Sequence, residues 1–106
     1  MNKIIGAFVF KDDGDGCLTA KWLNNDESTP YPEACKLIEG TKGEKKFEGK
    51  YISTWIEDST KVKHSNLSII SPSDGIYDLI WSNATSTIFT GRAMLYGDLL
   101  IGSYWD

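Results

Sequence analysis

The sequence predicts an all-β protein, a small antiparallel up-and-down barrel of about seven or eight strands. The first observation is a spacing of glycine, an apolar residue two positions on and tryptophan four further on. It occurs at Gly16, Leu18 and Trp22, at Gly49, Tyr51 and Trp55, and at Gly75, Tyr77 and Trp81. These even spacings place the apolar and aromatic side chains of each segment on one face of a strand.

The second observation is that short turn signals recur along the chain. The third is that the segments near its two ends are both strongly apolar. Asp-Gly and Pro-Ser-Asp-Gly segments supply turns between alternating runs, which is typical of a barrel or sandwich. Residues 4–10 and 99–105 are too apolar to be free sheet edges, so we expect these two segments to pair and close the barrel. We interpret residues 1–106 as a single domain.

The first half of the chain contains one ambiguous segment. We expect a strand at 4–10, a hairpin turn at 12–16, a strand at 17–23 and a loop at 24–32. Residues 33–39 could form one short helix, because Pro32 and Gly40 suit its two ends. The same residues could instead form a short strand, which we favour slightly because the rest of the chain is consistently β.

The second half of the chain alternates more regularly. We expect strands at 46–57, 62–70, 76–82, 87–95 and 99–105, with turns at 71–75 and 96–98. In the first of these, Phe47, Gly49, Tyr51, Ser53 and Trp55 share one face.

Composition and charge exclude several classes of function. The net charge of −4 argues against nucleic-acid binding, which requires clustered basic residues. The apolar runs are too short to span a membrane. The first residues do not read as a signal peptide, so a cytoplasmic location is expected, in which Cys17 and Cys35 would be free thiols.

No motif points to catalysis, a metal or a cofactor. Asp13 and Asp15 resemble part of a calcium loop, but the closing acidic ligand is missing, so we interpret them as a hairpin turn. His64 is the single histidine, and no cysteine or carboxylate lies at metal-ligand spacing from it. We therefore predict a protein that is not an enzyme and uses no cofactor.

Aromatic residues are the best candidates for a ligand site. The predicted inward-facing set is Trp22, Tyr51, Trp55, Tyr77, Trp81 and Phe89. These side chains either fill a packed interior or line a pocket. Small residues expected on the same faces leave space beside the rings, and both alternatives remain open: Ala20, Ser53, Gly91, Ala93 and Ser103.

The C-terminal third resembles the calycin group of barrels, which includes lipocalin-like and avidin-like domains. The resemblance lies in residues 75–81, 89–93 and 97–105: a glycine entering the strand, alternating aromatics, and Phe89 and Gly91 in the partner strand. It implies a barrel that binds a small apolar or amphipathic molecule in its interior. The alternative function is a carbohydrate- or protein-recognition module that uses exposed aromatics such as Tyr31, Tyr96 and Trp105.

Overall fold

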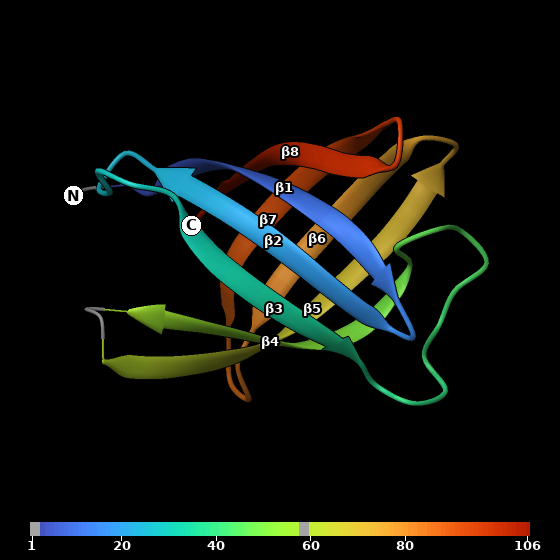
Figure 1. The fold of residues 1–106 in the computed structure, drawn as a ribbon, viewed down its shortest axis with the longest axis horizontal. Coiled ribbons are helices and arrows are strands. Elements are labelled where there is room, and N and C mark those ends of the chain that lie inside the picture. Colours follow the sequence, from blue (N-terminus) through green and yellow to red (C-terminus); the bar gives the residue numbers. More distant parts are fainter. Residues whose placement is uncertain (1–2, 58–59) are drawn as a thin grey trace.

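The computed structural model describes residues 3–57 and 60–106 and shows a closed barrel of eight antiparallel strands (Figure 1). The strands are β1 (Ile5–Gly14), β2 (Cys17–Asn24), β3 (Tyr31–Leu37), β4 (Gly49–Glu57), β5 (Lys61–Ser73), β6 (Ile76–Ser82), β7 (Thr87–Tyr96) and β8 (Leu99–Trp105). Each strand pairs with the next one in sequence. The predicted all-β up-and-down barrel is therefore confirmed. Among the described residues, no helix is long and apolar enough to cross a membrane.

Closure of the barrel uses the two segments that the sequence predicts to pair. β1 and β8 form an antiparallel ladder that runs from Ile5 opposite Trp105 to Lys11 opposite Leu99. This ladder gives hydrogen-bond partners to two apolar edges that would otherwise invite pairing with another chain.

The ambiguous segment at 33–39 is a strand, so the helix alternative is wrong. In β3, Glu33 and Cys35 are buried while Ala34 and Lys36 are exposed, which is the alternation of a strand with one face inside. The strand begins at Tyr31, so the predicted loop at 24–32 is shorter than expected and Pro32 lies within the ladder, opposite Lys21.

Three further expectations differ from the structure. The strand predicted to start at residue 46 starts at Gly49, because Phe47 has a φ of 73°, which is incompatible with a strand. Ser103 is exposed on the outer face, and the small interior residue of β8 is its neighbour Gly102, which lies opposite Ala93. β5 also extends to Ser73, into the predicted turn at 71–75.

The thrice-repeated spacing has a three-dimensional consequence. β2, β4 and β6 are alternate strands of an antiparallel barrel, so they run in the same direction. Each repeat therefore starts with its glycine at one end of the barrel and reaches its tryptophan toward the other. All three tryptophans consequently lie toward the same end.

The glycine end of the barrel is closed by the connection between β3 and β4, residues 38–48 (Figure 1). Phe47 is buried there, its ring packs edge-on against Tyr77 with centroids 6.3 Å apart, and its carbonyl accepts a hydrogen bond of 2.9 Å from the Tyr51 hydroxyl. Lys45 forms an ion pair with Asp74 that ties this connection to the β5–β6 turn. This half of the interior is a packed core.

Candidate functional site

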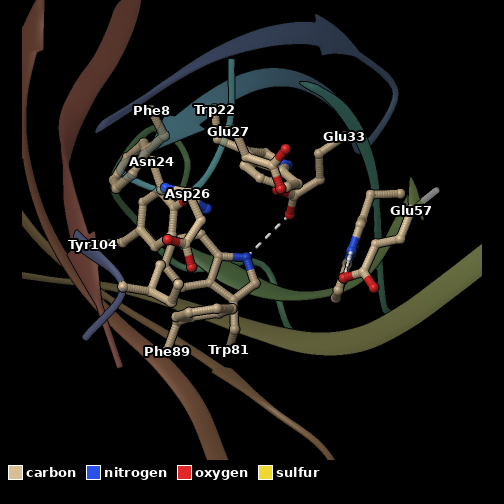
Figure 2. A pocket seen from close by; sticks show the side chains of 12 residues that line it. Phe8, Trp22, Asn24, Asp26, Glu27, Glu33, Glu57, Trp81, Phe89 and Tyr104 are labelled. Atoms are coloured by element: carbon tan, nitrogen blue, oxygen red, sulfur yellow. Dashed lines mark hydrogen bonds between the residues drawn. The ribbon is translucent and has the colours of Figure 1, made fainter. Parts of the chain in front are cut away.

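The tryptophan end of the barrel contains a cavity of about 190 Å³ that opens to solvent (Figure 2). Side chains from seven of the strands and from the β2–β3 connection converge on it. The lining residues are Ile4, Phe8, Trp22, Asn24, Asp26, Glu27, Glu33, Trp55, Glu57, Trp81, Phe89 and Tyr104.

The six predicted lining residues divide between the two halves of the barrel. Trp22, Trp55, Trp81 and Phe89 line the cavity. Tyr51 and Tyr77 do not, because both are buried in the packed half near Phe47. The two alternatives, a packed interior and a pocket, therefore each describe one half of the molecule. That these residues bind a ligand stays a prediction.

Glu33 of β3 forms the polar floor of the cavity. Its side chain is buried, and its Oε2 accepts hydrogen bonds from the Trp81 indole at 3.0 Å, from the Cys35 thiol at 3.6 Å and from the Ser53 hydroxyl. Figure 2 shows the bond to Trp81 reaching across the cavity. All three bonds end on Oε2, and Oε1 accepts none from the described residues. One carboxylate oxygen is therefore fixed and the other is available.

Burial raises the pKa values of the two titratable side chains at this floor, Glu33 and Cys35. Desolvation raises the pKa of Glu33 above its ordinary value of 4.5, against the lowering effect of the hydrogen bonds from Ser53, Trp81 and Cys35. Burial and the neighbouring Glu33 carboxyl also raise the pKa of the Cys35 thiol. The thiol is therefore kept protonated, and it is not suited to act as a nucleophile.

The cavity wall is a set of interlocked aromatic rings. Tyr104 packs edge-on against Phe89 at 5.3 Å and against Trp22 at 6.3 Å, and its hydroxyl accepts a 3.0 Å hydrogen bond from Asn24. Phe8 packs edge-on against Trp81 at 5.6 Å. Such pairs restrict ring motion, so the wall is formed before a ligand arrives.

Carboxylates surround the cavity entrance. Asp26 and Glu27 extend from the β2–β3 connection, and Glu57 lies at the end of β4 on the opposite side (Figure 2). Glu57 Oε1 accepts a 3.0 Å hydrogen bond from the Trp55 indole, which orients both side chains.

Sequence reasoning missed Glu33, Phe8, Tyr104 and the acidic entrance. Tyr104 carries a signal that could have revealed it, because Leu100 and Tyr104 in β8 repeat the four-residue step of Leu18 to Trp22. Glu33 could have been noticed as a carboxylate that shares the face of Cys35 and Leu37, once this segment is taken as a strand.

The other candidate residues lie away from the cavity. His64 is exposed, and its Nδ1 lies 3.0 Å from the Thr54 hydroxyl. Cys17 and Cys35 are free thiols, as expected, one outside and one inside the barrel wall. Asp13 and Asp15 belong to the β1–β2 hairpin, where Asp15 has a φ of 56°. Within residues 3–57 and 60–106, no group of histidine, cysteine and acidic residues could hold a metal ion.

Comparisons with protein-family models, curated proteins and solved structures found no match to this chain. The closed barrel is consistent with a calycin-like fold at the level of architecture.

The protonation of Glu33 predicts a specific pH dependence of stability. Above about pH 4.5 the unfolded chain loses this proton while the folded protein retains it, so the unfolded state binds fewer protons. The free energy of unfolding should then fall relative to Glu33→Gln by up to about 1.4 kcal/mol per pH unit, until the pH passes the folded-state pKa. Urea denaturation of both proteins between about pH 4 and pH 8 measures this. A constant difference across that range would contradict the prediction.

Proposed function

We propose that this protein binds a small amphipathic molecule non-covalently in the open end of its barrel, as a calycin-like binding protein. The observation that carries the proposal is the cavity, whose aromatic wall suits an apolar ring and whose floor presents the Glu33 carboxyl. Concave apolar sites with few polar groups are the common form of small-molecule pockets.

The size of the cavity limits the ligand. A dry protein cavity of about 150 Å³ accommodates benzene, and this one measures about 190 Å³. A single ring with a short polar substituent therefore fits, and the open entrance allows a longer substituent to extend into solvent. We propose the cytoplasm as its location, because both thiols are free.

The alternative, recognition of carbohydrate or protein through exposed aromatics, stays a prediction that no specific observation favours. Tyr96 and Trp105 are exposed, but they lie at opposite ends of the paired strands β7 and β8. Tyr31 is half-buried and packs against Trp22 with centroids 5.1 Å apart. These three residues do not form one surface.

Tryptophan fluorescence tests the proposal, with benzyl alcohol as the probe. Three of the four tryptophans line the cavity and Trp105 lies on the outer face, so a saturable change in emission is expected. Trp105→Phe should leave the affinity within about twofold of the wild-type value. Trp55→Ala should weaken it about tenfold, the effect of about 1.4 kcal/mol from one aromatic contact. Absence of saturable binding, or equal affinity in Trp55→Ala, would count against a ligand in this cavity.

A further inference from the structure

We infer that the ligand of this cavity is a small organic cation, a protonated arylalkyl amine whose ammonium group is held by Glu33. The inference rests on the proposed function, because it names the chemical class of the molecule that the cavity binds. Three features of the cavity support it: the sign of the charges at its entrance, the unbonded oxygen of its buried carboxyl and its aromatic lining.

The charged side chains that line the cavity all carry carboxyl groups: Asp26, Glu27, Glu33 and Glu57. By register, Lys61 and Lys63 of β5 lie opposite Glu57 and Trp55, but both lysines are exposed and neither is among the lining residues. An anionic ligand would meet repulsion from the carboxylates at the entrance, whereas a cation is attracted by them.

The floor offers one hydrogen-bond acceptor in a fixed position. Ser53, Trp81 and Cys35 hold Glu33 Oε2, so the carboxyl plane is set before binding. Oε1 accepts no bond from the described residues, and Glu33 lines the cavity. An ammonium N–H that donates to Oε1 forms a charge-assisted hydrogen bond in a largely desolvated place, where such bonds are strong.

The rings around this acceptor suit a cation with an aromatic body. Trp22, Trp55 and Trp81 all line the cavity, and tryptophan faces attract ammonium groups more strongly than the other aromatic side chains do. The ring of the ligand can pack beside Phe8 and Phe89, which contribute apolar surface to the same wall. A neutral ring would use the wall and leave the carboxyl without an ionic partner.

Binding of such a cation is coupled to the release of the Glu33 proton. Burial raises the pKa of Glu33 in the empty site, and the incoming ammonium group keeps its own charge. At a pH at which Glu33 is protonated in the empty site, the ion pair forms when the carboxyl loses its proton to the solvent. The polar and titratable groups that face Glu33 are Ser53 of β4, Trp81 of β6, Tyr104 of β8 and Cys35 of its own strand. Both Cys35 and Tyr104 have raised pKa values, so they stay protonated at neutral pH.

Isothermal titration calorimetry with three probes of similar size tests the inference. The probes are benzylamine, benzyl alcohol and phenylacetate, which differ in charge. We expect benzylamine to bind at least tenfold more tightly than benzyl alcohol and phenylacetate to bind most weakly. At a pH below the folded-state pKa of Glu33, titrations in two buffers of different ionisation enthalpy should show proton release with benzylamine and none with benzyl alcohol.

Three variants test whether Glu33 at the cavity floor causes the preference for benzylamine. Glu33→Gln should weaken benzylamine binding at least tenfold and abolish the proton release, and it should weaken benzyl alcohol far less, because an amide can still hydrogen-bond to a hydroxyl. Glu44→Gln, the same change in an exposed residue of the closing connection, should alter neither affinity. If Glu33→Gln fails to fold, Glu57→Gln at the entrance should weaken benzylamine about threefold and spare benzyl alcohol.

The outcomes separate the two proposals. If benzylamine and benzyl alcohol bind equally, or if phenylacetate binds best, the cation inference is overturned while a small-molecule site remains. An amine affinity that neither Glu33→Gln nor Glu57→Gln reduces overturns it as well. If none of the three probes binds, the proposed function itself fails.

Discussion

Replacement of Phe47 by alanine is expected to lower the free energy of unfolding by about 3–5 kcal/mol, the range for deleting a buried phenylalanine side chain. Phe47 is 2% exposed and closes one end of the barrel against Tyr77. No neighbouring strand can move into the space, because β-ladders hold each strand in register. A domain of this size has about 5–15 kcal/mol of stability in total, so the loss is a large share.

Chemical denaturation measures this effect, and Phe47→Gly provides an informative control. The φ of 73° at this position is strained for alanine and free for glycine. The glycine variant should therefore be more stable than the alanine variant by up to about 1 kcal/mol, the reverse of the usual order in a strand. A loss under about 1 kcal/mol in Phe47→Ala would show that the ring does not close the core. Benzyl alcohol binding at the other end should survive in conditions where the variant is folded.

Replacement of Gly102 by alanine is expected to cost roughly 3 kcal/mol or more, at the upper end of overpacking effects. Gly102 lies on the inner side of β8, opposite Ala93 in β7 and Phe8 in β1. The new Cβ would lie 2.7 Å from the Ala93 Cα and would collide with the Arg92 carbonyl oxygen. These are backbone atoms of a paired strand, so relief requires separation of β7 and β8.

Gly97→Ala is the matched control for this prediction. Gly97 has a φ of 61° in the β7–β8 turn, and a Cβ there meets no atom within 4 Å. Its expected cost is about 1 kcal/mol, from backbone conformation alone. Thermal and urea denaturation of both variants compare steric collision with backbone strain. Equal losses in the two proteins would refute the tight approach of β7 and β8.

Local sequence patterns predict the fold class of this protein well. Even spacing between Leu18 and Trp22, or Tyr77 and Trp81, reports which side chains share a face, because the strand period of two is a property of the backbone. Turn residues such as Gly75 mark where the chain reverses. The apolar character of residues 4–10 and 99–105 predicted closure, since free apolar edges are unfavourable.

Local patterns failed to predict the conformation or orientation of residues whose positions depend on contacts with distant segments. Phe47 alternates with Tyr51 as if it belonged to β4, yet its positive φ and its packing on Tyr77 are set by a connection that folds back over the barrel end. Ser103 was expected to face inward but is exposed, and Gly102 lies on the inner face, for a related reason. Register across β7 and β8 decides which of two adjacent residues faces inward.

The sequence by itself determined most of the strands and the closure of the barrel, because these follow from the even spacing of apolar residues and from the apolar character of the two terminal segments. Only the tertiary structure decided that Glu33 is a buried acid facing a cavity, with Ser53 and Trp81 holding one of its oxygens. The cavity is the space that side chains from many strands leave unfilled. The raised pKa of Glu33 results from the desolvation that these side chains cause together. Neither quantity belongs to any single segment of the chain, so neither can be read from one.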